Sequence, residues 1–190
     1  MCNHFLMDVQ ALVDAFVERI NSGPRDLQSC DEVPESLREA SPVPDQMPDD
    51  HTEWRIVRAD NRERILRLED RIGRVFPPSF LDLVSRFSFP AFEYGPLLFF
   101  ANHCEETFWD LSRRLFSDPT MSPALLSAGF IQIGNPYFYN YDPVCFDCNL
   151  GAPEPRLVQL DHEAILCNSE IRIVREIAPS FIAILKGAVE

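Results

Sequence analysis

Residues 24–53 constrain the fold of this 190-residue chain more than any other part, because they cannot form a core of their own. The segment holds five prolines and nine acidic residues against two arginines, and its few apolar residues follow no period. Such a sequence buries too little apolar surface to offset the entropy lost on folding. We therefore predict a flexible acidic linker over residues 24–53, between an N-terminal helix and a main unit. The sequence leaves open whether that helix packs on the main unit.

The first unit, residues 1–23, is predicted to be an amphipathic helix over residues 4–22. Its apolar residues recur at steps of three or four, which places them on one helical face: Phe5, Val9, Leu12, Phe16 and Ile20. Gly23-Pro24 ends the pattern. The segment does not begin with basic residues, and acidic residues interrupt its apolar ones, so we do not expect a secretory signal. We expect a cytoplasmic protein with reduced thiols.

The second unit, residues 54–190, is long enough to build one core without disulfides. Its helical patterns come mostly first and its strand patterns cluster later, which favours an α+β fold with a mixed or antiparallel sheet flanked by helices. The expected elements are helices over 60–73, 77–87 and 105–116, strands over 97–101, 130–133, 144–146, 157–160 and 171–174, a turn at 134–136, and a helix from about residue 179.

The net charge of −13 limits the classes of partner. An acidic chain repels phosphate backbones, so we expect no nucleic-acid binding, and it favours a basic protein partner. More than half of the negative charge lies in residues 24–53. Residues 119–141 carry no charge, yet prolines and glycines interrupt them, so we expect no membrane span.

Cys145 and Cys148 form a C-x-x-C pair, which in other settings is half of a zinc site or a redox pair. His162 and Cys167 are the candidates for two further ligands. Their spacing fits no zinc-ribbon pattern, and residues i and i+3 of a strand point to opposite faces. We interpret the pair as packing residues and keep metal or thiol chemistry as an alternative.

His162 lies between Asp161 and Glu163, an arrangement suited to general acid–base catalysis. The alternative is a polar turn after a strand that caps the residues following it. The chain has no nucleophile elbow, no phosphate-cradling glycine loop and no His-Glu-x-x-His motif. We therefore expect neither an enzyme nor a cofactor.

The segment 136–143 is dense in aromatic residues and bracketed by prolines. Tyrosines on such a loop provide a large contact area with little rotamer entropy to lose, so the segment is the candidate partner-binding site. The alternative is that the rings cover a sheet edge. The candidate binding residues are Tyr137, Phe138, Tyr139, Tyr141 and Asp142. Trp54 is expected to anchor the start of the main unit in the core.

A series of motifs spans residues 54–190. In chain order they are Trp54, Ile65-Leu66-x-Leu68-Glu69-x-x-Ile72-Gly73, Phe76-Pro77-Pro78-Ser79-Phe80, Phe89-Pro90-Ala91-Phe92, Leu98-Phe99-Phe100-Ala101-Asn102, Phe130-Ile131-Gln132-Ile133-Gly134-Asn135, Tyr141-Asp142-Pro143-Val144-Cys145-Phe146-Asp147 and Ile177-Ala178-Pro179-Ser180-Phe181. Their order resembles the SUKH superfamily, the domain of fungal cell-wall-synthesis regulators of the Smi/Knr type and of many bacterial relatives. Residues 86–90 differ from the Asn-Gly-Gly of many members and resemble a bacterial subgroup.

The resemblance implies an α+β domain with helices flanking a mixed sheet, and no enzymatic activity. Many bacterial members resemble immunity proteins, which bind and neutralise a cognate toxin, often a nuclease. The expected function is therefore a non-catalytic immunity protein that occludes a toxin. One alternative is a regulatory scaffold that uses the N-terminal helix and linker. The other is a metal- or thiol-dependent protein acting through Cys145, Cys148, His162 and Cys167.

Overall fold

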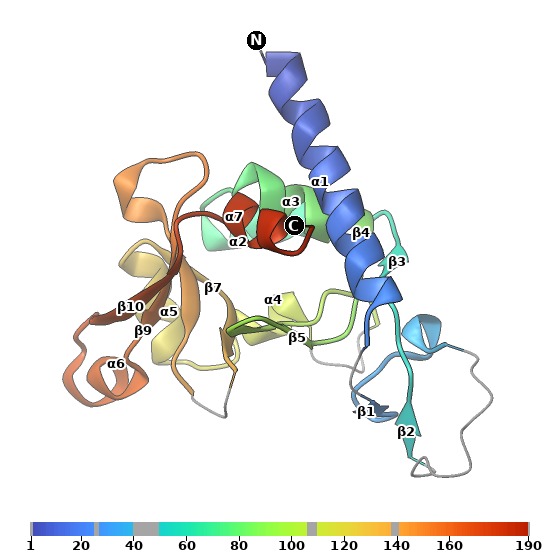
Figure 1. The fold of residues 1–190 in the computed structure, drawn as a ribbon. Helices are drawn as coiled ribbons and strands as arrows, with labels where there is room; N and C mark the ends of the chain where they lie inside the picture. The colour runs from blue at the N-terminus through green and yellow to red at the C-terminus, as the bar shows by residue number, and fades with distance from the viewer. Residues whose placement is uncertain (1, 25–26, 40–49, 106–109, 138–140, 190) are drawn as a thin grey trace.

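A six-stranded sheet organises the fold in the computed structural model of this chain, which describes residues 2–24, 27–39, 50–105, 110–137 and 141–189 (Figure 1). Each strand pairs antiparallel with its neighbour in the chain, so spatial order follows chain order. The strands are β5 (Phe92–Tyr94), β6 (Leu97–Phe99), β7 (Phe130–Pro136), β8 (Val144–Asp147), β9 (Leu157–Leu160) and β10 (Ile173–Ala178). The predicted α+β class is confirmed.

The central strands β8 and β9 are buried on both faces and carry apolar residues at successive positions, whereas most of the edge strand β10 is exposed. Val144 and Phe146 face the main core, whereas Cys145 and Val158 face a smaller one. The main core is completed by residues of α1 (Cys2–Ser22), α2 (Arg62–Ile72), α3 (Pro78–Arg86), α4 (Leu111–Arg114) and α7 (Phe181–Gly187). The smaller core is completed by α5 (Met121–Ser127) and α6 (His162–Asn168).

Aromatic rings fill the centre of the main core. Phe92 stacks on Phe99 with ring centroids 4.9 Å apart, and the edge of Phe181 meets Phe99 at 6.0 Å. Phe80 joins the same group through an edge contact with Phe181 at 5.3 Å. Each such pair adds about 0.5–1.5 kcal/mol to the gain from burying the rings. These aromatic side chains therefore join helices α3 and α7 to the sheet.

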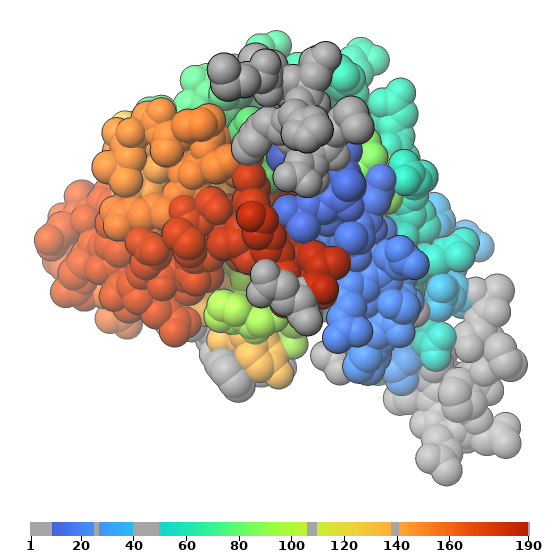
Figure 2. Space-filling view, turned by 45° about the horizontal axis from the view of Figure 1, so that its top comes forward, coloured from blue at the N-terminus to red at the C-terminus, as the bar shows by residue number. Residues whose placement is uncertain are grey.

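Helix α1 packs on the main unit as part of its core, a point that the sequence left open. Val13 and Phe16 are fully buried, and the Phe16 ring meets the edge of Tyr94 at 5.3 Å. The helix contacts α3 and α7, and Figure 2 shows it (blue) beside the C-terminal residues (red). The amide of Asn21 holds its C-terminal end, donating to the carbonyl of Ile56 and accepting from the Ile56 N–H, each at 2.9 Å.

The expectation of a flexible linker over residues 24–53 does not hold for residues 27–39. Val33 and Leu37 are fully buried in the main core, which also holds the buried Trp54 that was expected to anchor there and that forms a β-bridge with Arg38. Two isolated apolar residues are enough to hold this segment in place because they pack on a core that other elements build. The short pieces are β1 (Gln28–Ser29), which pairs with β2 (His51–Thr52), and the 3₁₀ turn η1 (Glu35–Leu37). Residues 40–49 of the expected linker lie outside the described residues.

Local sequence chemistry explains several element boundaries. Helix α2 ends, as predicted, at Gly73, which adopts a left-handed φ of 68°. The turn expected at 134–136 is instead part of β7. There Gly134 allows the strands to approach, since a Cβ at that position would come within 2.2 Å of the Leu98 carbonyl oxygen. The helix expected over 105–116 is shorter in the structure, since α4 begins after its N-cap Asp110, whose backbone is extended, and ends at Arg114; residues 106–109 lie outside the described residues.

The remaining short elements are β3 (Val57–Arg58), which pairs with β4 (Phe87–Ser88), and the 3₁₀ turn η2 (Cys148–Leu150). Helix α5 and strand β5 were not predicted, and β10 begins two residues later than the strand expected at 171–174. Within the described residues, no helix combines the length and the apolar character needed to cross a membrane.

Candidate functional site

The β7–β8 loop carries the aromatic residues predicted to bind a partner. Its first residue, Tyr137, is tied to the β5–β6 turn by a hydrogen bond from its N–H to the Pro96 carbonyl at 3.0 Å. Tyr141, near the other end of the loop, has 76% of its surface exposed. Phe138 and Tyr139 lie outside the described residues. Two of the four predicted aromatic residues are therefore placed, and both are exposed.

Asp142 differs from its aromatic neighbour because it is buried, with 7% of its surface exposed. Its carboxylate accepts hydrogen bonds from the His162 backbone N–H at 3.0 Å and from the Gln159 side-chain amide at 2.6 Å. A third contact joins it to Nδ1 of His162 at 2.7 Å. Buried carboxylates are stable only when hydrogen-bonded in this way. Asp142 therefore anchors the loop to the sheet rather than presenting itself to a partner.

His162 is the first residue of α6, and its side chain pairs with Asp142 of the β7–β8 loop. The contact between Nδ1 and the Asp142 carboxylate at 2.7 Å sets the orientation of the imidazole ring. The flanking Asp161 serves the helix instead, accepting from the Ala164 N–H at 2.9 Å as its N-cap and pairing with Arg172. This is the capping turn that the sequence offered as the alternative to acid–base chemistry.

The loop anchor extends across the sheet as a polar network. The Gln159 side chain on β9 accepts from Nε of Arg175 on β10 at 2.8 Å, while its amide donates to Asp142. The chain Arg175–Gln159–Asp142–His162 thus joins two strands, the loop and α6. Sequence reasoning named neither Gln159 nor Arg175 as part of the site. The available signal was Gln159 itself, a polar residue in the otherwise apolar strand 157–160, since a buried amide requires partners.

The surface of the site is formed by Tyr141 above this network. Its ring centroid lies 6.0 Å from that of His162, with the two planes tilted by 58°. An exposed tyrosine therefore adjoins an imidazole that the buried carboxylate holds in place. This arrangement offers an apolar face, a hydroxyl and an imidazole N–H or lone pair to a molecule that approaches the loop.

The cysteine candidates are not brought together. Cys145 on β8 is fully buried in the smaller core, whereas Cys148, which begins η2 just after that strand, packs against the main core. Burial raises the pKa of Cys145 well above its ordinary value and also raises the pKa of Cys148. Both thiols therefore resist forming the thiolate that metal binding or redox exchange requires. Cys167 is exposed on α6, while His162 bonds Asp142.

Among the residues that the structure describes, no three His, Cys, Asp or Glu side chains form a group able to hold a metal ion. The alternative of a shared site at Cys145, Cys148, His162 and Cys167 has no geometric support in this part of the chain.

Comparison with models of known protein families gives no match for this chain. A search of curated proteins likewise finds no similar sequence.

Proposed function

We propose that this chain is a non-catalytic protein-binding domain of the immunity type, which neutralises a cognate toxin by docking the β7–β8 loop over the toxin's working surface. The observation that carries the proposal is the contrast between Tyr141 and Asp142. One ring is exposed, and the next residue is buried and held by three polar contacts. The tyrosine is thus displayed from a fixed backbone position.

Holding the backbone beside Tyr141 in place before binding lowers the entropy lost on association, so more of the contact energy appears as affinity. Tyrosine is among the residue types most often found at binding hot spots, because it offers large area and a hydroxyl with few rotamers to freeze. Tyr141 and the partly exposed Tyr137 lie at the two ends of the same loop. The loop therefore has the chemistry of a protein-binding anchor.

The charge of the chain supports a basic partner. With a net charge of −13, the protein attracts a cationic protein over long range and speeds its encounter. A nuclease toxin fits this requirement because its cleft must attract phosphate. The order of the sequence motifs, which resembles that of the SUKH superfamily, supports the immunity type within the wider class of binding proteins.

The scaffold alternative is not favoured by the structure. It requires the N-terminal helix to offer its apolar face to a partner, but Val9, Val13, Phe16 and Val17 of that face are buried in the main core. A partner would have to displace α1 from the fold before binding it.

The test is a pull-down from native lysate with the tagged full-length chain, its Tyr141→Ala variant and a Leu150→Ala control. Leu150 is also exposed and apolar, but it follows the opposite end of β8. The captured protein is identified, purified and assayed for cell toxicity with and without each variant. We expect one stoichiometric toxic partner that wild type and Leu150→Ala neutralise. Tyr141→Ala should bind it about thirtyfold more weakly, as for a hot-spot residue.

All three proteins should unfold at the same temperature, because neither substitution touches the core. Absence of a specific partner would refute the binding function, and capture of a partner that is not toxic would refute the immunity type. Equal binding by Tyr141→Ala and wild type would refute the role of the loop.

A further inference from the structure

A histidine is built into the anchor of the β7–β8 loop. His162 supplies two of the three contacts described above for the buried Asp142. Its backbone N–H donates to the carboxylate at 3.0 Å, and its Nδ1 lies 2.7 Å from the same oxygen. The third contact comes from Gln159 at 2.6 Å. The backbone and amide donors keep their protons at every physiological pH, whereas the ring contact changes with the protonation of the imidazole.

The ring contact is strongest when the imidazole is charged. An imidazolium donates from both nitrogens and attracts the carboxylate, and charge-assisted hydrogen bonds are about twice as strong as neutral ones. A neutral ring carries one proton, so Nδ1 is a donor in only one of its two tautomers. Histidine side chains pass between these forms over about pH 5 to 8. A rise in pH through this range therefore weakens the contact between His162 and Asp142.

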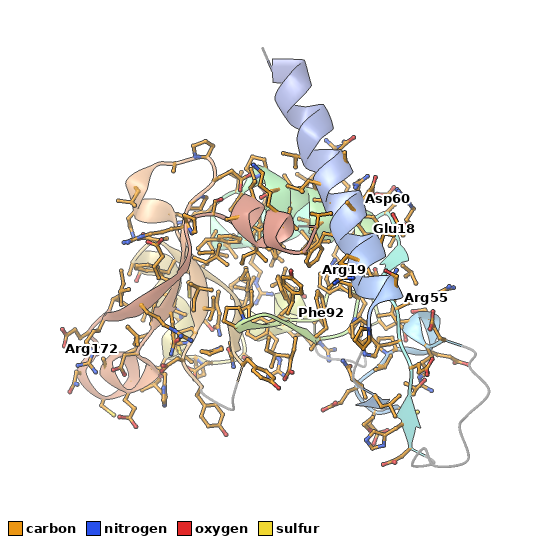
Figure 3. All side chains as sticks on the ribbon, viewed as in Figure 1. Glu18, Arg19, Arg55, Asp60, Phe92 and Arg172 are labelled. Atoms are coloured by element: carbon orange, nitrogen blue, oxygen red, sulfur yellow. The ribbon has the colours of Figure 1, made fainter. Side chains whose placement is uncertain are left out.

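The charged groups around this contact keep their charges over the same range. Arg172, labelled in Figure 3, pairs with Asp161 and holds the pKa of that carboxyl below its ordinary value. Glu163, the next residue of α6, is exposed to solvent, and Arg175 on β10 reaches the network through a neutral amide. Helix α5, which packs on α6, carries no titratable side chain. His162 is therefore the group of this cluster whose charge changes near neutral pH.

The state of the anchor bears directly on the exposed ring of the loop. Tyr141 precedes Asp142 in the chain, and its ring centroid lies 6.0 Å from that of His162. When the anchor loosens, the backbone beside Tyr141 gains conformations, and a partner that binds the ring has to order it again. Weakening one contact of the anchor therefore lowers the affinity of the loop without removing any residue that touches the partner.

We propose that His162 makes the β7–β8 loop a pH-sensitive binding site, with the anchored form favoured in mild acid and loosened above neutral pH. The inference rests on the proposed function, because it concerns the regulation of the same loop. The charge on one imidazole then sets how firmly Tyr141 is displayed.

Hydrogen exchange of the free full-length chain, followed by NMR between about pH 5.5 and about pH 7.5, tests this pH switch. The reporter is the backbone N–H of residue 162, which donates to Asp142, with its protection corrected for the intrinsic pH dependence of exchange. The Ala164 N–H, which donates to Asp161, reports fraying of the same helix. The ¹³C shifts of the His162 ring follow the charge of the imidazole in the same samples.

The test variant is His162→Gln, because a glutamine amide can donate to the carboxylate at every pH but never carries a charge. The matched control is His51→Gln. His51 also lies beside a carboxylate, with its Nδ1 2.9 Å from Asp50, but it belongs to β2. If His162→Gln did not fold, the wild-type curves alone would still decide, because the midpoint of protection must coincide with the titration of the ring.

We expect protection of the N–H at position 162 to fall about fivefold as the pH rises, with the midpoint of the ring titration, while protection at Ala164 stays within about twofold. The fall should persist in His51→Gln and vanish in His162→Gln. Constant protection in wild type, a midpoint that differs from that of the ring, or a fall that persists in His162→Gln would overturn the proposal. A chain that shows the fall but captures no toxic partner would support the pH switch and refute the proposed function.

Discussion

Phe16→Ala tests whether the N-terminal helix is a structural part of the core. Phe16 is fully buried, and its ring lies 5.3 Å from that of Tyr94 and 6.5 Å from those of Phe92 and Phe99. The substitution removes an entire ring from the contact between α1 and the sheet. Phe92, labelled in Figure 3, marks the position of this contact in the fold.

The magnitude follows from the burial. Removing a fully buried phenylalanine side chain costs about 3–5 kcal/mol, because the surroundings collapse only partly into the space. The whole free energy of unfolding of a natural domain is about 5–15 kcal/mol. For a chain of this length, each kcal/mol shifts the melting temperature by about 2–4 °C. We therefore expect Phe16→Ala to lower the melting temperature by about 6–20 °C.

Circular dichroism during heating and urea titration measures this change. The control is Glu18→Ala, which alters an exposed position on the same helix and should change stability by no more than about 0.5 kcal/mol. If α1 were joined to the rest only by a flexible linker, Phe16→Ala would leave the main transition unchanged. That outcome would refute the account of the core given above.

Two further predictions concern a buried carboxylate and a close strand contact. Burial works to raise the pKa of Asp147, but hydrogen bonds, first from Arg156, outweigh it and hold the pKa below its ordinary value. The stability this gives is present above the ordinary pKa and is lost as the pH falls through the lowered one. Arg156→Gln should therefore move acid unfolding, followed by circular dichroism, to higher pH, and an unchanged midpoint would contradict this. Gly134→Ala should destabilise the fold by more than about 3 kcal/mol in urea titration, because its Cβ would strike the Leu98 carbonyl oxygen. Gly187→Ala, where a Cβ meets nothing within 4 Å, should be neutral or stabilising, and similar losses in both would contradict the steric argument.

Much of the main unit follows from local sequence patterns. The helix that ends at Gly73 and the strands near 130–133, 144–146 and 157–160 were all predicted. In each segment, the repeat of the apolar residues and the residues that end the element indicate the same structure. These elements also carry the residues that fill the core, so burial and local propensity point the same way.

The errors arise where distant parts of the chain decide the structure. Val33 and Leu37 are isolated apolar residues in an acidic segment, and nothing local indicates that the core has room for them. The β7–β8 loop shows the same division. Tyr141 was predicted as a binding residue from its aromatic neighbours, and this stays a prediction. The pairing of Asp142 with His162, twenty residues away, depends on how β8, β9 and α6 follow one another in space.

The contact between α1 and α7 sets the order in which the fold can be completed. The strands of the sheet add one after another along the chain, so each finds its partner as soon as it is synthesised. Helix α1 instead packs against α3 and against α7, whose residues are the last of the described elements to leave the ribosome. Until then Phe16 and its neighbours lack part of their cover. The nascent chain therefore carries α1 with part of its apolar face uncovered until α7 has been made, and its yield in cells should depend on chaperones that hold such segments.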